Sequence, residues 1–258
     1  MADAAPAAPS PSTVPVPPPA SRVAAGDETV MSLVDHLSEL RTRLVRVIIG
    51  VLVGSAVGFW LAVPIRNFLV TPLPSQQLQV LGPGDAFMIT LRIAFVTGVI
   101  LSMPVILYQV WAFVAPGLTP SERRVVRPWI PLALVFFALG VTIAWVVLPF
   151  AVGFLLSFTD DVLLGDRLAA GPYFDFVTTM FLAFGIIMEF PILLFGLSRV
   201  GILTSERLRA SRRYVILGIA IFSAVATPGG DPISPLILGG TMYLLFEATT
   251  WFIRRTGR

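Results

Sequence analysis

The sequence contains no cysteine and no lysine, and it has a single histidine, His36. Without cysteine the chain can form no disulfide, thiol nucleophile or cysteine-ligated metal site. A single histidine excludes a multi-histidine centre, so we expect no metal and no cofactor. We also find no residues arranged for covalent catalysis and no nucleotide-binding loop, so we do not expect an enzyme.

Charge is scarce as well. Charged residues make up 13% of the chain, against roughly 25% in a soluble globular domain. Hydrophobic residues make up 56%, and the mean hydropathy is +0.86. The chain lacks the polar surface that a water-facing globule needs, so we expect a lipid bilayer around it. The net charge of +3 is too small and too scattered to indicate a nucleic-acid partner.

Composition divides the chain into three parts. Residues 1–30 are rich in Ala, Pro and Ser with few large apolar side chains, which predicts a disordered tail. Residues 31–255 are expected to form one transmembrane domain, and residues 256–258 a short C-terminal tail. The first residues make a poor signal peptide, because no basic start precedes a continuous apolar stretch.

Hydropathy predicts six transmembrane helices in an all-α fold. Four apolar runs are close to or above the ~17–25 residues that a helix needs to cross a bilayer; they are 47–63, 87–114, a run from Arg127 to about Phe158, and 176–198. Two shorter runs, 214–227 and 232–246, would extend only about 21–23 Å against a hydrocarbon core of ~30 Å. Either both cross a thinned bilayer or they form a re-entrant hairpin; we favour two short spans.

Arginine placement predicts the orientation. With six crossings, fifteen arginines lie on one side, only Arg66 and Arg167 lie on the other, and Arg92 falls within a span. Positively charged residues remain cytoplasmic. We therefore expect both termini in the cytoplasm.

Two acidic residues lie on the side predicted as cytoplasmic. Residues 32–46 have the period of an amphipathic helix that leads into the first span, and Glu39 on its polar face could simply pair with Arg43 one turn later. Thr119 and Glu122 form a capping box with Pro120 at the first helical position. Each acid thus has an ordinary structural explanation.

Glu189 is different because it interrupts an apolar run. A charge near the bilayer centre costs at least ~2.5–3.5 kcal/mol. The side chain must therefore face protein, water or a partner, or be protonated. A neutral glutamate that only packs helices together is the other interpretation.

Several stretches resemble the TatC family of the twin-arginine translocation system. They are 35–44 (DHLSELRTRL), 104–118 (PVILYQVWAFVAPGL), 122–124 (ERR), 183–191 (AFGIIMEFP), 213–215 (RYV) and 227–228 (TP). Together they extend over nearly all of the predicted transmembrane domain. The stretch from Tyr108 to Phe113 is long and unusual, so chance agreement is a poor explanation.

The resemblance implies a glove-like fold of six helices in the bacterial cytoplasmic (inner) membrane, and a signal-peptide receptor that exports folded proteins using the protonmotive force. Implied partners are twin-arginine signal peptides, single-span TatA and TatB-type subunits, and further copies of the chain. Residues that match functional positions of the family are Glu39, Glu122, Arg41 and Phe113 in the signal-peptide site, Glu189 on the concave wall, and Pro72 and Asp231 in the outer loops.

Two other functions fit parts of the pattern. A proton-coupled secondary transporter could use Glu189 as its protonatable residue, although the midplane offers one acid and the chain shows no internal repeat. A purely structural scaffold would tolerate alanine at Glu39, Glu122 and Glu189.

Overall fold

A computed structural model describes residues 33–73, 77–120, 123–124, 127–158, 167–199, 210–227 and 231–255. The expected tails, 1–30 and 256–258, lie outside the described residues. The chain divides into two units, residues 1–38 and residues 39–258. The boundary falls within the first helix, and the second unit contains all the other elements.

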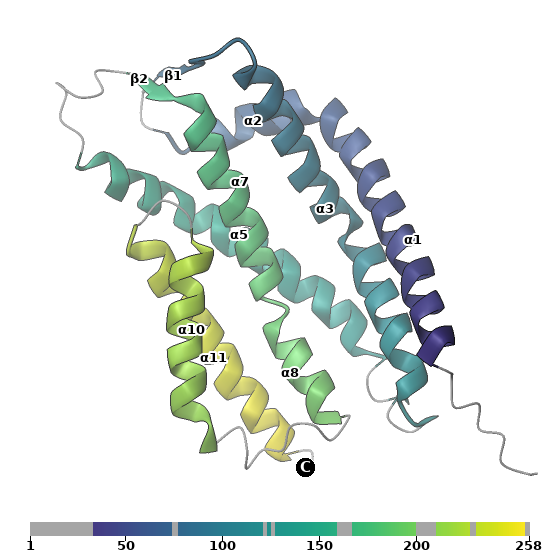
Figure 1. Cartoon of the computed structure of the whole chain (residues 1–258). Coiled ribbons are helices and arrows are strands. Elements are labelled where there is room, and N and C mark those ends of the chain that lie inside the picture. Colours follow the sequence, from purple (N-terminus) through teal and green to yellow (C-terminus); the bar gives the residue numbers. More distant parts are fainter. Residues whose placement is uncertain are drawn as a thin grey trace, which may run out of the picture. The chain divides into compact units, whose positions relative to one another are not determined.

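The described elements are almost entirely helical (Figure 1). In chain order they are α1 (Leu33–Trp60), α2 (Ala62–Val70), β1 (Gln77–Gln79), α3 (Asp85–Val114), the 3₁₀ turn η1 (Ala115–Gly117), α5 (Trp129–Leu156), β2 (Arg167–Ala169), α7 (Ala170–Ile187), α8 (Phe190–Arg199), α10 (Arg212–Ala226) and α11 (Ile233–Arg255). The all-α expectation missed β1 and β2, which pair in parallel with Leu78 opposite Leu168.

Five stretches of the described chain are long and apolar enough to cross a membrane: Asp35–Trp60, Asp85–Gly117, Trp129–Leu156, Ala170–Ser198 and Ile233–Arg255. The expectation that the last span is short is wrong, because α11 continues to Arg255 and has 23 residues. At ~1.5 Å per residue it extends about 34 Å, enough for the hydrocarbon core. Of the two runs predicted to be short, only α10, with 15 residues, is shorter than the hydrocarbon core requires.

The first span ends at a proline-dependent break. Helix α1 is continuous through the predicted amphipathic segment and stops at Trp60, and α2 starts at Ala62. Pro64 has no N–H to donate to the carbonyl of Trp60, so the α1 ladder is interrupted there. The expected run of 47–63 thus divides between α1 and a separate helix that hydropathy alone did not separate.

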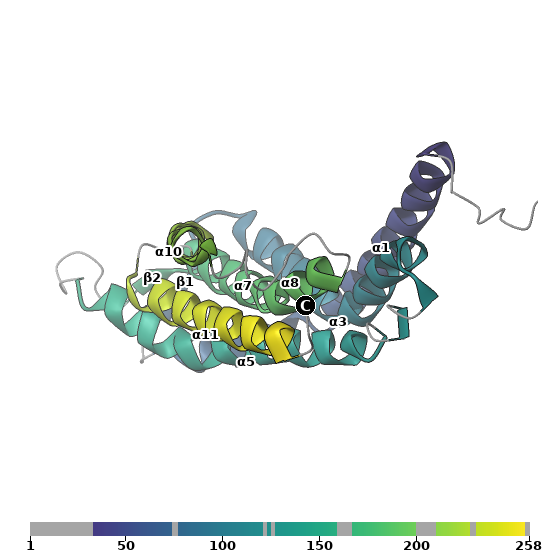
Figure 2. The same cartoon turned by 90° about the horizontal axis from the view of Figure 1, so that it is seen from below.

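Helices α3, α5 and α7 pack against one another and carry the core, and Figure 2 shows α11 alongside α5. Fully buried side chains include Leu148 on α5, Phe184 on α7 and Phe246 on α11. Half of the apolar window of the α7–α8 span is buried, against 6% of that of α1. The large apolar side chains exposed on α1 have no protein cover among the described residues, as expected of a lipid-facing helix.

Helix α1 packs against α3 through small residues. Gly50, Gly54 and Gly58 recur every four residues, and a Cβ on Gly54 would lie 2.6 Å from the carbonyl oxygen of Gly98. The Ser102 hydroxyl donates to the carbonyl of Gly50 at 2.7 Å. Such stripes allow transmembrane backbones to approach closely. This contact fixes the part of α1 within the second unit against α3.

Candidate functional site

Glu39 and Arg43 face each other one helical turn apart on α1. The Nε of Arg43 donates to Oε1 of Glu39 at 2.9 Å, and Nη2 of Arg43 donates to the same oxygen. Nη1 of Arg43 reaches Oε1 of Gln109 on α3 at 3.4 Å. The pairing of Glu39 with Arg43 that the helical spacing suggests is therefore present, and Arg43 links it to a second helix.

The second oxygen of Glu39 is uncommitted. Among the described residues, Oε2 of Glu39 is buried without a hydrogen-bond partner, and so is Nε1 of Trp111 on α3. Only 17% of the Glu39 side chain and 18% of the Arg43 side chain are exposed. Buried polar atoms are rarely left unpaired in native structures. The arrangement therefore provides a carboxylate with one oxygen occupied by a guanidinium and the other without a partner.

The other residues expected at this site are distributed as follows. Arg41 lies exposed on α1, and Phe113 is half-buried in the last turn of α3. Glu122 lies outside the described residues, although the amide of Arg123 donates to the carbonyl of Thr119 at 2.9 Å. The structure thus brings Glu39 together with Arg43 and Gln109, whereas its relation to Glu122 remains a prediction. Gln109 was not identified from the sequence, where only its position in the 104–118 stretch distinguished it.

Glu189 lies at a break in the fourth span. Helix α7 ends at Ile187 and α8 begins at Phe190, while the amide of Glu189 bonds the carbonyl of Ile186 in a tighter turn. Pro191 has no N–H to donate to the carbonyl of Ile187, which explains the interruption. The side chain is half-buried, and its Oε1 is buried with no hydrogen bond to any residue that the structure describes. Glu189 therefore lies where the helical hydrogen-bond pattern of the fourth span is interrupted.

The two outer-loop candidates have structural surroundings. Pro72 is half-buried in the turn that follows α2. Asp231 is 2% exposed, and its Oδ2 accepts the amide of Ser234 at 2.6 Å, as a cap at the start of α11 does. Its other oxygen, Oδ1, is buried without a partner.

Two interhelical ion pairs were not predicted. Arg92 on α3 pairs with Asp175 on α7 at 2.5 Å. The sequence signal was Arg92 within an apolar run, but the fourth span was expected to begin after Asp175. Glu247 on α11 pairs with Arg212 on α10 at 2.7 Å. The α10–α11 pair explains why both charges are tolerated near the ends of these helices.

Comparison with known proteins supplies the family. The model of a family described as Sec-independent protein translocase protein (TatC) matches residues 35–240. A TatC from Halalkalibacterium halodurans is 34% identical over 239 residues, covering 90% of this chain and 92% of the relative. A TatC from Carboxydothermus hydrogenoformans is 31% identical over 231 residues, covering 88% and 95%.

A solved structure agrees with the sequence comparison. The crystal structure of a twin arginine translocase receptor, TatC, in the detergent DDM superposes with a TM-score of 0.75. It is 33% identical in sequence and covers 84% of this chain and 99% of its own. The relatives are named as translocase subunits, which are transport components. The chain is therefore a polytopic membrane protein that belongs to the TatC family of Sec-independent protein translocases.

Proposed function

We propose that this chain is the signal-peptide receptor and core subunit of a twin-arginine translocation system. The observation that carries the proposal is the Glu39 carboxylate, which already binds one guanidinium and keeps Oε2 without a partner. The related crystal structure is described as that of a twin arginine translocase receptor. Its similarity over most of this chain supports the same role here.

The chemistry of the site suits paired arginines. A guanidinium is a planar fork that binds a carboxylate through two parallel bonds, whereas an ammonium is a point charge. Glu39 accepts one arginine of the signal peptide, and Glu122 accepts the other. Arg41 and Phe113 flank the bound peptide. Charge-assisted bonds contribute about 1.5–3 kcal/mol each, so two of them give selectivity while the cargo remains releasable.

The rest of the chain serves assembly and passage. Both termini are cytoplasmic, α10 provides the sixth crossing, and the membrane is the bacterial cytoplasmic membrane. Single-span TatA and TatB-type subunits pack near Glu189, where the α7–α8 break leaves a carboxylate oxygen unbonded. Further copies of the chain complete the receptor complex, and the protonmotive force drives transport of folded cargo. Pro72 and Asp231 position the loops on the outer side.

Photo-crosslinking tests the docking site. A photoreactive residue at position 39, 113 or 122 is expected to capture a twin-arginine signal peptide, and a paired-lysine peptide is expected to be captured much less. Position 158 provides the control, because Phe158 is exposed just after α5, on the side predicted as outer. Equal capture of both peptides from positions 39 and 122, or equal capture from position 158, would contradict the proposal.

A further inference from the structure

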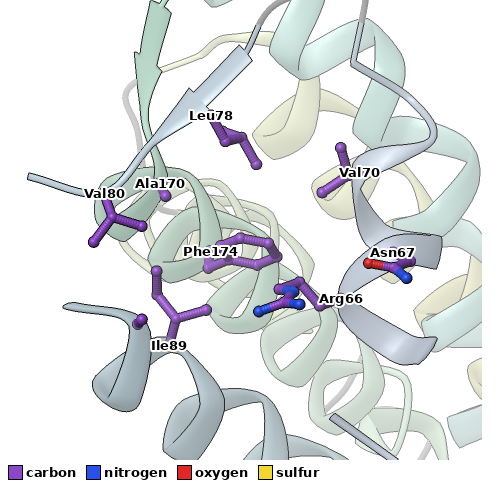
Figure 3. Close-up of a pocket in the computed structure, with 9 residues that line it drawn as sticks. Arg66, Asn67, Val70, Leu78, Val80, Ile89, Ala170 and Phe174 are labelled. Carbon is purple, nitrogen blue, oxygen red and sulfur yellow. The ribbon is translucent and has the colours of Figure 1, made fainter. Parts of the chain in front are cut away.

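A pocket of about 410 Å³ lies between α2, β1 and the first turns of α3 and α7. Its walls are mostly apolar. They include Leu78 in β1, Val80 directly after β1, Ile89 on α3 and Phe174 on α7. Two polar residues, Arg66 and Asn67 on α2, complete the lining. Figure 3 shows Arg66 reaching from α2 toward Phe174 and Ile89. The pocket is separate from Glu39 and from Glu189.

Fixed contacts hold the walls in place. The Tyr173 hydroxyl donates to the carbonyl of Leu69 at 2.6 Å, which ties α7 to the end of α2. The β1–β2 pair ties the segment with Leu78 to the residues that lead into α7. The pocket is thus a built feature of the fold, within the size range of small-ligand sites.

Arg66 lacks a counter-ion among the residues described. Of the acids on the neighbouring helices, Asp85 accepts the amides of Leu81 and Gly82 through Oδ2, and Asp175 pairs with Arg92. In the stretches that the structure covers, no carboxylate lies within ion-pair distance of Arg66. The half-buried guanidinium of Arg66 is therefore free, among the described residues, to bind an anion from outside the chain.

The depth of the pocket identifies the source of that anion. Ile89 and Phe174 each lie four residues into their helices, about 6 Å along the axis. Trp60, 81% exposed, ends α1 immediately before α2, and exposed tryptophans concentrate at membrane interfaces. The headgroup layer is about 5–7 Å thick on each side of the hydrocarbon core. A phospholipid offers its phosphate and its upper acyl carbons at this depth.

We propose that the pocket binds the headgroup of an anionic phospholipid from the surrounding leaflet. The Arg66 guanidinium holds the phosphate through paired hydrogen bonds, and Asn67 supplies a further donor. Phe174, Ile89 and Val80 contact the glycerol and the first methylenes of the acyl chains. This site is additional to the peptide receptor proposed above and does not depend on it.

Lipid titration monitored by native mass spectrometry tests the proposal on the purified full chain. Phosphatidylglycerol is the probe, and Arg66→Gln is expected to weaken its binding roughly tenfold, the effect of losing charge-assisted bonds. Arg66→Lys, which keeps the charge and loses the fork, should fall between. Arg254→Gln removes an exposed arginine from the last turn of α11 and is expected to change binding less than twofold.

A second variant blocks the space without changing charge. Val80 is 48% exposed at the rim, so Val80→Trp fills the pocket with little effect on the core and is expected to reduce lipid binding as much as Arg66→Gln. Unchanged elution and thermal unfolding of Arg66→Gln show that the fold is intact. Lipid binding that persists in both variants would overturn the proposal. Equally tight binding of soluble glycerol phosphate would overturn the lipid as the source.

Discussion

Two carboxylates of this protein are half-occupied in the same way but by different partners. Glu39, near the start of α1, gives one oxygen to the guanidinium of Arg43 and leaves the other buried and unbonded among the described residues. Asp231, before the last span, gives one oxygen to the amide of Ser234 and leaves the other buried and unbonded. Under the proposed orientation these two sites lie on opposite sides of the membrane.

The partner determines what each acid can do. Arg43 bonds only Oε1 of Glu39, so a second guanidinium that reaches Oε2 would not displace it. The amide of Ser234 lies in the first turn of α11, where an amide has no partner within the helix, so releasing it would leave it unpaired. Glu39 can therefore bind a second arginine beside Arg43, whereas Asp231 is committed to the start of α11. Glu39 is suited to recognising a peptide, and Asp231 is suited to fixing the start of a helix.

The largest expected effect is at Glu39. Glu39→Gln keeps the shape and removes the charge, so we expect affinity for a twin-arginine peptide to fall roughly 10–150-fold, the equivalent of one charge-assisted bond of about 1.5–3 kcal/mol. Fluorescence anisotropy with a labelled peptide measures the change.

Glu247→Gln is the matched control for that measurement. It also neutralises an arginine-paired glutamate at a helix end, through Arg212, but should leave peptide affinity unchanged. If both variants bind the peptide as the original chain does, Glu39 is no different from a structural ion pair.

The fixed acid should show a smaller effect, on stability. Asp231→Ala removes the acceptor of the Ser234 amide, so we expect the free energy of unfolding to fall by about 1 kcal/mol, within the range for lost helix caps. Asp231→Asn keeps an acceptor oxygen and should be nearly neutral. Thermal unfolding in detergent, followed by helical circular dichroism, measures both. A weaker peptide affinity of Asp231→Ala at unchanged stability would contradict the distinction drawn here.

The sequence predicted most of the helical fold because apolar runs, prolines and arginines each act locally. The fourth apolar run was predicted as one span, whereas the structure divides it at Glu189 and Pro191 into α7 and α8. Hydropathy failed where polar residues continue a helix. The stretch from Glu247 to Arg255 ends the apolar run but remains helical in α11, where Glu247 has Arg212 as a partner.

Contacts between distant segments were beyond local patterns. The spacing of Glu39 and Arg43 within one helix predicted their pairing, but Gln109 lies 66 residues from Arg43. Gln109 comes near Arg43 because α1 packs closely against α3 at Gly54 and Gly98. A hydropathy profile does not predict such packing between helices. The partner of Arg92 was missed for the same reason, since Asp175 belongs to another helix.

Arg43→Lys should have the smallest effect, and its sign separates two roles for this residue. An ammonium cannot bond Glu39 and reach Gln109 at once as the guanidinium does. If Arg43 orients Glu39, peptide affinity should fall roughly 2–5-fold, because ordering a free side chain on binding costs about 0.5–1 kcal/mol. If Arg43 competes for Glu39, affinity should instead rise. We expect the fall, since Arg43 bonds only Oε1, and Oε2 of Glu39 has no partner among the described residues to give up. In the Glu39→Gln background the same substitution should have little further effect, because the two residues act through one contact. An equal fall in both backgrounds would show that Arg43 acts without Glu39, and the comparison with Asp231 would lose its basis.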